Sequence, residues 1–280
     1  MKAFHSIDLM CRVLKVGRSS YYDWKQGPRR LPRNHDALRV AIREAFQSNR
    51  GTYGYRRIYV TLQEGAVRGS RKLILRLMKA MKLEAAPWKP SPYAAVRKAQ
   101  ESIVCPNLLD RQFKPSGRNQ VWAGDITYIW TQKGWVYLAV VLDLFSRRVV
   151  GWSVSSTPDT ALVLAALSQA LQGRSYVRGS LLFHSDQGCQ YTSRAFQEFL
   201  GERGIKGSMS RRGQCWDNAP TESFFRSFKR ETGLRRLHLA GQGEVEMLVL
   251  DWIETWYNLR RKHTFNGYRS PAEREMKRAA

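Results

Sequence analysis

The sequence is poor in cysteine and in long apolar runs, and each shortage excludes a class of protein. Its four cysteines, Cys11, Cys105, Cys189 and Cys215, are scattered and form no Cys-x-x-Cys pair, which disfavours a zinc site. Nothing in their spacing calls for disulfides, so we expect a reducing cytoplasm. Charged residues interrupt the first eight positions, which predicts no signal peptide. The apolar runs are far shorter than the roughly 20 residues that a membrane helix needs.

Acidic residues are also scarce, with 23 Asp and Glu against 47 Lys and Arg. The formal net charge of +24 indicates a polyanionic partner. The alternatives are a ribosomal-type protein and a membrane-surface binder. The aromatic-rich second half, with its regular apolar pattern, argues against a chain that is only a basic extension. The excess is concentrated in residues 1–115, which hold 24 basic and 8 acidic residues, against 23 and 15 in residues 116–280. We therefore expect the N-terminal part to grip DNA.

The first 83 residues read as short helices. Residues 1–27 fit either a small helix-turn-helix or a plain helical hairpin. From His35 to about Leu83, apolar residues recur at helical spacing, and a turn at 51–58 and a cap at Ser70 divide the segment into three helices. Arg56 and Arg57 lie among its outward basic residues, which suit a DNA-binding bundle or a solvated helix face. Residues 84–117 are rich in proline and predict a linker.

From residue 118 the pattern changes to strands, and residues 118–280 predict a catalytic core with a C-terminal helical extension. Segments 121–130, 135–142 and 148–154 are rich in Val, Ile, Tyr and Trp. A helix (159–172), a strand (180–184), a helix (193–203), a strand (205–209) and a helix (219–232) follow, with a mobile loop expected at 210–217. This order predicts the α/β ribonuclease-H-like architecture, a mixed five-stranded sheet with helices, preceded here by a small all-α domain.

Three carboxylates stand at informative positions in this predicted core. Asp125 lies in the first strand, Asp186 directly follows the fourth, and Glu222 opens the last helix, with 35 residues between Asp186 and Glu222. The first and fourth strands would be neighbours, so these acids would converge. Oxygen-only ligands suit Mg²⁺ or Mn²⁺, and two such ions about 4 Å apart clamp both oxygens of a phosphoryl displacement. The sequence therefore predicts a metal-dependent enzyme acting on phosphodiesters.

Basic residues accompany these acids. Glu222, Arg226 and Lys229 share one face of the last helix, where Lys229 would meet DNA phosphate. We also expect DNA contacts from Arg211 and Arg212 in the loop before that helix. The alternative is an exposed Glu222–Arg226 pair, worth only tenths of a kcal/mol.

Three further polar residues are notable, and two of them, Asp143 and His184, have two readings each. Asp143 is a rival metal ligand, although its place at a strand end favours a turn-capping role. His184 would support the site rather than touch DNA. Asp217 would be an anion at the start of the last helix.

The motifs resemble one family over nearly the whole chain. The relevant segments are Asp125-Ile-Thr-Tyr, Asp143-Leu-Phe-Ser-Arg, His184-Ser-Asp-Gln-Gly, Ser208-Met-Ser-Arg, Asp217-Asn-Ala-x-x-Glu222-Ser-Phe-Phe, Tyr53-Gly-Tyr-Arg-Arg, Arg76-Leu-Met, Trp256-Tyr-Asn and Ser270-Pro-Ala-Glu. They resemble the second-reading-frame (OrfB) transposases of the insertion-sequence-three family, whose core is similar to that of retroviral integrases.

This resemblance implies 3′-end cleavage of the element by activated water and strand transfer without a covalent enzyme intermediate. It carries Asp125, Asp186 and Glu222 over as catalytic ligands of two Mg²⁺ ions, replaceable by Mn²⁺, and Lys229 as the basic residue beside them. Expected partners are the element's terminal repeats, target DNA, further copies of the chain and an upstream-frame (OrfA) product, in a bacterial cytoplasm at the nucleoid. A structure-specific nuclease and a regulatory DNA-binding partner of a longer frameshifted transposase are the alternatives.

Overall fold

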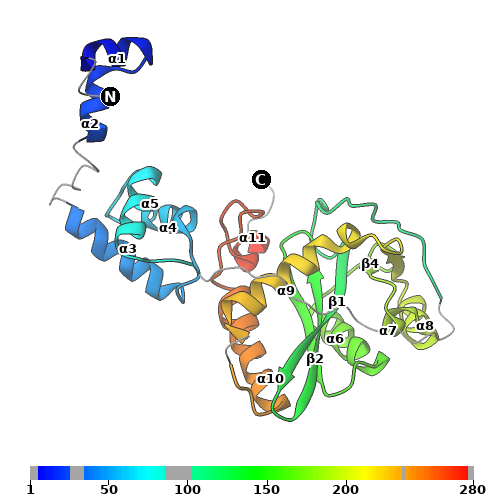
Figure 1. Cartoon of the computed structure of the whole chain (residues 1–280). Helices are drawn as coiled ribbons and strands as arrows, with labels where there is room; N and C mark the ends of the chain where they lie inside the picture. The colour runs from blue at the N-terminus through cyan, green and yellow to red at the C-terminus, as the bar shows by residue number, and fades with distance from the viewer. Residues whose placement is uncertain (1–5, 26–34, 86–102, 235–236, 277–280) are drawn as a thin grey trace.

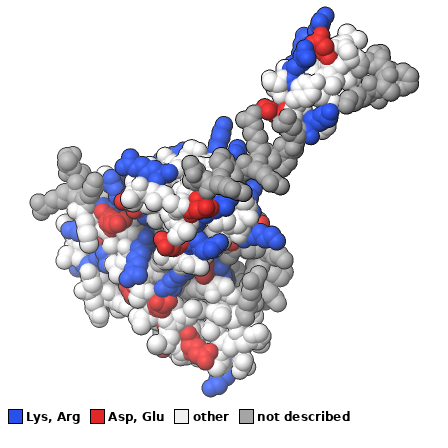
Figure 2. All heavy atoms as spheres, turned by 90° about the vertical axis from the view of Figure 1, so that its left-hand side faces the viewer, with Lys and Arg blue, Asp and Glu red and all other residues white. Residues whose placement is uncertain are grey.

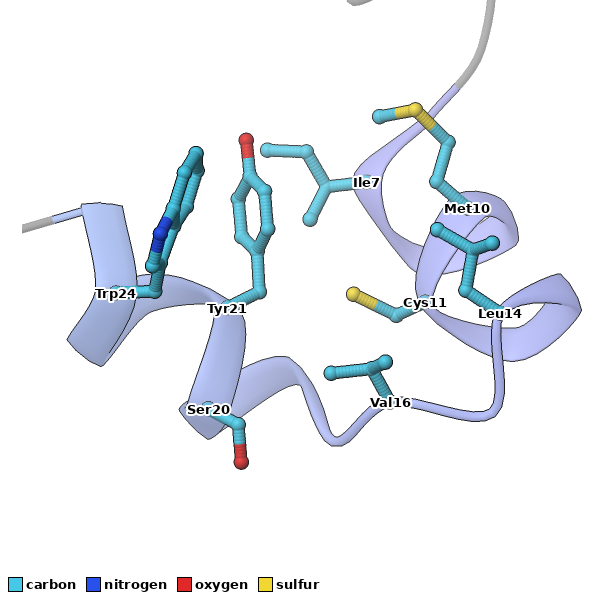
Figure 3. Close-up of a pocket in the computed structure, with 8 residues that line it drawn as sticks. All are labelled: Ile7, Met10, Cys11, Leu14, Val16, Ser20, Tyr21 and Trp24. Atoms are coloured by element: carbon cyan, nitrogen blue, oxygen red, sulfur yellow. The ribbon is translucent and has the colours of Figure 1, made fainter.

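The computed structural model describes residues 6–25, 35–85, 103–234 and 237–276 of the chain (Figure 1). Its N-terminal helices are α1 (Ile7–Val13) and α2 (Arg18–Lys25), and the Ser6 side chain caps α1 by accepting a hydrogen bond from the N–H of Leu9. The two helices enclose an apolar pocket of 220 Å³ (Figure 3). Of the two readings for this segment, the described residues therefore show a helical hairpin.

A second helical unit follows, as the sequence predicts. It consists of α3 (Asp36–Ser48), α4 (Tyr55–Gln63) and α5 (Arg71–Ala80). The side chains that face its centre, Ile42, Ile58, Ile74 and Leu77, are completely buried. Ser70 caps α5 through the N–H of Leu73. Apolar spacing and a polar cap thus produce the expected bundle.

The α3–α5 bundle packs against the C-terminal part of the chain. The Tyr53 hydroxyl accepts a hydrogen bond from the N–H of Lys262 at 2.7 Å. Arg50 forms an ion pair with Asp251 at 2.8 Å. Apolar residues of both regions belong to one buried cluster. The two parts are therefore joined by side-chain contacts as well as by the predicted linker, of which residues 86–102 lie outside the described ranges.

The centre of the molecule is a mixed five-stranded sheet of the predicted ribonuclease-H-like kind. Its strands are β1 (Val121–Thr131), β2 (Gly134–Asp143), β3 (Arg148–Ser155), β4 (Leu182–Ser185) and β5 (Lys206–Met209). They stand in the order β3-β2-β1-β4-β5, with β1 antiparallel to β2 and parallel to β4. β1 is thus central, and its neighbour is the fourth strand.

Helices cover both faces of this sheet (Figure 1). On one face α6 (Thr160–Gly173), the short α7 (Cys189–Thr192) and α8 (Arg194–Glu202) bury Trp122 and Phe183. On the other face lie α9 (Ala219–Glu231) and α10 (Gln242–Leu250). The chain then continues through a π-helical segment, η4 (Asp251–Tyr257), to α11 (Pro271–Met276). None of the described helices is long and apolar enough to span a bilayer.

Candidate active site

Asp125 lies in the middle of β1, beside the end of β4. β1 pairs with β4 only over Val121–Ala123, whereas its pairing with β2 continues to Thr131. A Cβ on the preceding residue, Gly124, would meet the Phe183 ring at 2.5 Å, so only glycine allows this close packing. The Asp125 carboxylate accepts a hydrogen bond from the N–H of Ile126 at 2.8 Å. The strand thereby fixes this acid at the sheet edge where β4 ends.

Asp186 follows β4 directly and reaches the same edge. Its Oδ1 atom accepts a hydrogen bond from the N–H of Gly188 at 2.9 Å, which closes a tight turn before α7. Because β1 and β4 are parallel neighbours, the two aspartates come from adjacent strands, as the predicted strand order requires.

Glu222 approaches from the first turn of α9. A proline near the helix start suits that turn, where a backbone N–H would lack a partner. The Asn218 side chain donates a hydrogen bond to the Gly124 carbonyl at 3.3 Å and so ties the helix start to β1. On the opposite side, Phe224 and Phe228 are buried against the sheet. The aromatic face fixes the helix and leaves Glu222 turned toward the aspartates.

The three carboxylates line a single cavity of 310 Å³. Its other walls come from the turn after β4 and from the loop before α9: Gln187, Ser210, Arg211, Arg212, Gly213, Gln214 and Asn218. The structure therefore brings together the three acids that the sequence singled out, although they lie far apart in the chain.

The cavity is electrostatically unfavourable for three carboxylates without a counterion. Burial raises the pKa of Asp125 to about 8, and the negative charges of Asp186 and Glu222 add to this effect. Burial likewise raises the pKa of Glu222, and Arg226 partly offsets that rise. A cation in the cavity would relieve the repulsion.

The chemistry of these donors fits a hard divalent cation. Within the described residues, no three His, Cys, Asp or Glu side chains stand in a cluster already arranged to hold an ion. Asp125 and Asp186 each direct one oxygen to a backbone N–H. Each carboxylate has a second oxygen, and carboxylate oxygens are the ligands that Mg²⁺ and Mn²⁺ prefer.

The loop from Ser210 to Asn218 is anchored over the cavity rather than loosely attached. The Asp217 carboxylate, which is fully buried, accepts hydrogen bonds from Arg211 Nε at 2.9 Å, Arg111 Nε at 2.6 Å and Asn107 Nδ2 at 2.9 Å. The Arg211 guanidinium, followed by Arg111, holds the pKa of Asp217 well below its usual range. The loop that the sequence predicts to be mobile thus has a buried ion pair at its end, which sequence spacing did not reveal.

The predicted DNA-binding residues around the cavity lie in two places. Arg211 and Arg212 belong to the cavity wall, with Arg212 exposed and Arg211 partly engaged by Asp217. Arg226 is exposed on α9, one turn beyond Glu222, and Lys229 is half-buried on the same helix. Arg211 and Arg212 therefore border the carboxylates directly, and Arg226 lies close enough to Glu222 to affect its pKa.

Arg56 and Arg57, the predicted pair on α4, point in different directions. Arg56 is exposed. Only 18% of the Arg57 side chain is exposed, and its Nη1 atom lies 3.8 Å from Glu231 of α9. Its guanidinium also stacks over the Tyr53 ring, 5.3 Å from the centroid. The structure thus gives Arg57 a partner inside the protein and leaves Arg56 on the surface.

His184 and Asp143 both serve the scaffold. The buried His184 ring lies between the hydroxyls of Ser208, at 2.9 Å, and Ser210, at 3.2 Å, and so connects β4 to β5 and to the start of the loop after β5. The buried Asp143 accepts hydrogen bonds from the N–H groups of Asn119 and Phe145. These contacts match the supporting and turn-capping readings of the two residues.

Two contributors to the site escaped sequence reasoning. Thr221, whose hydroxyl donates a hydrogen bond to the Asn218 carbonyl at 2.9 Å, helps to lower the pKa of the Asp125 carboxyl, and Asn218 joins α9 to β1. Both residues lie in the Asp217–Glu222 motif, so their closeness to Glu222 in the sequence is the one feature that could have indicated a role in the site. Their partners on β1 are distant in sequence and became visible only in the fold.

Models of known protein families match the same parts of the chain that form the sheet and the α3–α5 bundle. Models described as an integrase core domain match residues 115–215 and 203–271, and a model described as an HTH-like domain matches residues 33–90. Fold and family matches together define an integrase-core enzyme, a DDE-type polynucleotidyl transferase with an HTH-like domain that binds DNA.

Curated relatives specify the family. Transposase InsF of the insertion sequence IS3A from Escherichia coli is 39% identical over 100% of this chain and 97% of its own length. The transposase of the element IS904 from Lactococcus lactis is 38% identical over 86% of this chain and 94% of its own. The chain belongs to the IS3-type family of insertion-sequence transposases.

Solved structures of integrases are more distant. The HTLV-2 integrase catalytic core in complex with magnesium has a TM-score of 0.45 and 20% identity, over 58% of this chain and 99% of that one. The catalytic core of the BIV integrase has a TM-score of 0.41 and 17% identity, over 55% of this chain and 92% of that one.

Proposed function

We propose that this transposase cuts one DNA strand at each end of its element and joins the freed end to target DNA, with Asp125, Asp186 and Glu222 as its catalytic residues. The observation that carries this proposal is the single cavity in which the three carboxylates meet. The repulsion between the three carboxylates and the raised pKa values of Asp125 and Glu222 favour a bound divalent cation.

Asp125, Asp186 and Glu222 would hold two Mg²⁺ ions, for which Mn²⁺ can substitute. Such ions lower the pKa of water and stabilise the attacking and leaving oxygens of a phosphoryl displacement. The protein's own part is to fix the three carboxylates on β1, after β4 and on α9. The anchored loop, held by Asp217, closes one side of the cavity.

Two displacements at phosphorus account for the reaction. In the first, a water oxygen bonds to phosphorus at the element end, and the bond to the 3′-oxygen breaks and releases a 3′-hydroxyl. In the second, this hydroxyl oxygen bonds to a target phosphorus, and the target's own 3′-oxygen leaves with a proton. Arg212, Arg226 and Lys229 position the phosphates through charge-assisted hydrogen bonds.

The proposed function also implies partners and a location for the enzyme. The α3–α5 bundle would bind the terminal repeats of the element, through Arg56 and the exposed basic residues Arg43, Arg68, Arg71, Lys72, Arg76 and Lys79. Figure 2 shows Lys and Arg side chains spread over the side of the molecule on which α3–α5 lie. We further propose a division into a DNA-binding region (1–83), a linker (84–117) and a catalytic core (118–280). The chain would assemble with its own copies on DNA, with or without an upstream-frame partner, in the cytoplasm at the nucleoid.

A strand-transfer assay with labelled element-end DNA and Mg²⁺ tests the proposal. Wild-type protein should give joined products, and Glu222→Gln should lose them because an amide neither carries the charge nor replaces both carboxylate oxygens. Glu202→Gln is the matched control, since Glu202 lies exposed in α8. Equal joining by Glu222→Gln would refute the assigned triad. Nicking without joining would favour a structure-specific nuclease. DNA binding without any cleavage or joining, even after the upstream-frame product is added, would favour a regulatory DNA-binding partner.

A further inference from the structure

The β1–β2 hairpin reaches beyond the rest of the sheet. β4 accompanies β1 only as far as Ala123, and β3 pairs with β2 only from Tyr137 to Asp143. The residues from 126 to 136 therefore form the outer part of the hairpin, which starts directly beyond Asp125. Any DNA strand that leaves the catalytic cavity in this direction meets the hairpin first.

Four aromatic side chains line one face of this hairpin, and we call them the aromatic row. They form two directly opposed cross-strand pairs, Tyr128 with Tyr137 and Trp130 with Trp135. Neighbouring rings touch edge to face, with centroids 5.2 Å apart in the tyrosine pair and 4.9 Å apart in the tryptophan pair. Trp130 is 62% exposed and Tyr128 is 43% exposed. Exposed aromatic surface of this extent is uncommon unless it binds something.

One end of the aromatic row lies near the catalytic carboxylates, on the other face of β1. Tyr128 lies three residues beyond Asp125, about 10 Å away at 3.3 Å per residue, and side chains at this spacing point to opposite faces of a strand. Because β4 pairs with β1 only as far as Ala123, β4 does not cover the edge of β1 between Asp125 and Tyr128. Burial and Tyr137 raise the pKa of the Tyr128 hydroxyl, and the nearby charges of Asp186 and Asp125 contribute. At the other end, exposed Lys133 occupies the turn between the strands. The row thus runs from the neighbourhood of Asp186 to a cation.

We propose that the aromatic row is a stacking platform for unpaired DNA bases next to the reacting phosphodiester, an inference that rests on the proposed transposase function. Aromatic rings hold bases of any sequence because every base has a flat π-face. Bases inside a duplex are stacked on each other, so the row selects a strand that has separated from its complement. Its proximity to Asp186 around the edge of β1 that β4 does not cover and the net charge of +24 favour DNA over a second copy of the chain as the occupant.

Binding of two labelled probes tests this platform: an oligodeoxythymidylate and a blunt duplex of equal length. In the full-length protein, Trp130→Ala and Trp135→Ala should each weaken binding of the single strand roughly tenfold, with the duplex little affected. Trp130→Phe, which keeps a ring, should retain most of the affinity. Phe265→Ala is the matched control, because Phe265 is an aromatic residue that is 41% exposed in the C-terminal segment, away from the β1–β2 hairpin in the sequence. Thermal unfolding of each variant establishes that it is folded.

A second probe separates the contribution of the bases to binding from that of the phosphate backbone. An oligonucleotide with abasic sites keeps the phosphates, so wild-type protein should bind it about as weakly as Trp130→Ala binds the intact strand. Three outcomes would overturn the platform. The tryptophan variants could lose equal affinity for the single strand and the duplex, or lose affinity for neither. Their sedimentation could also change, which would show that the aromatic row is an interface between copies of the chain.

The two proposals fail in different ways. Glu222→Gln should bind the single strand like wild type, because it leaves the aromatic row intact. If wild-type protein prefers the single strand through Trp130 but performs no metal-dependent joining, the proposed function alone is refuted. If wild type joins DNA and Trp130→Ala binds single strands and joins DNA as well as wild type does, only the platform is refuted.

Discussion

Asp125 shows how a single residue can oppose folding while serving the proposed chemistry. Its carboxylate is surrounded by protein and by two other acids, so its ionised form is disfavoured and its pKa is raised to about 8. Functional sites often retain such unfavourable groups, at the expense of stability. The cost should be measurable by removing the charge.

Asp125→Asn should stabilise the metal-free protein by about 1–3 kcal/mol, because it removes a buried carboxyl group that has acidic neighbours. Mg²⁺ should raise the melting temperature of wild-type protein and leave that of the variant almost unchanged. Thermal unfolding in chelator and in Mg²⁺ measures both effects. A variant that is less stable than wild type in chelator would contradict the account.

His263 makes a prediction about pH. Burial, together with Arg261, Arg57 and Arg147, lowers the pKa of His263 well below its usual value. Its Nε2 atom lies 3.1 Å from Arg261 Nη1, so the neutral ring accepts that hydrogen bond. The unfolded chain takes up a proton near pH 6.5 and the folded chain does not, so the unfolded state binds more protons below that pH.

The free energy of unfolding should therefore fall as pH drops below about 6.5, by at most about 1.4 kcal/mol per pH unit from this group. Denaturant unfolding between pH 7 and pH 5 measures the slope. His263→Gln should remove this part of the slope, and His238→Gln, at an exposed position, should leave it. An unchanged slope in His263→Gln would argue against a neutral buried ring.

At the scale of elements, β3 and α6 approach each other unusually closely. A Cβ on Gly151 of β3 would lie 2.1 Å from the carbonyl oxygen of Ala166 and 2.8 Å from the backbone nitrogen of Ala170. Both atoms belong to helix backbone, so neither can turn aside as a side chain would. The distance between sheet and helix thus depends on one missing methyl group.

Gly151→Ala should destabilise the protein by at least about 2 kcal/mol, because α6 must move away from the sheet. Gly201→Ala in α8 is the control: no atom lies within 4 Å of the added Cβ, and a stabilisation of about 0.5–1 kcal/mol is expected. Urea unfolding of the three proteins gives the comparison. Equal stability of both variants would show that the helix adjusts freely.

The elements of the sheet were largely predictable, because β-branched and aromatic runs and helical periodicity reveal them locally. The adjacency of Asp125 and Asp186 followed from strand order alone. The π-helical segment from Asp251 to Tyr257 was not predictable, since its burial on several sides removes the amphipathic pattern. The directions of Arg56 and Arg57 could not be predicted either, because the carboxylate that draws Arg57 inward belongs to distant Glu231.

At the scale of the whole molecule, the buried Glu231 connects three parts of the chain. Its carboxylate accepts hydrogen bonds from Arg261 Nη2 at 2.7 Å and Arg261 Nε at 2.8 Å, and Arg57 of α4 lies 3.8 Å away. Lys262, next to Arg261, forms an ion pair with Glu64 and donates its backbone N–H to Tyr53. The α3–α5 bundle, the catalytic helix α9 and the C-terminal segment therefore share one polar centre.

The two neighbouring arginines of α4 should separate stability from DNA binding. Arg57→Met should destabilise the protein by about 1–3 kcal/mol, because it takes a cation from a buried carboxylate. Arg56→Met should leave stability nearly unchanged, weaken element-end binding and reduce the salt dependence by about one phosphate contact. Unfolding curves and salt titrations of DNA binding test both. If Arg57→Met weakened DNA binding and Arg56→Met lowered stability instead, the α3–α5 bundle would contact DNA through the face that carries Arg57.

The polar centre around Glu231 also limits how this enzyme can be re-engineered. A chimera that exchanges residues 35–85 for another recognition bundle would leave Glu231 without Arg57 and the Lys262 N–H without the Tyr53 hydroxyl. A graft that retargets the enzyme to a new sequence must therefore bring its own counterparts to Glu231 and Lys262. The α3–α5 bundle and helix α9 must therefore be exchanged together in any such design.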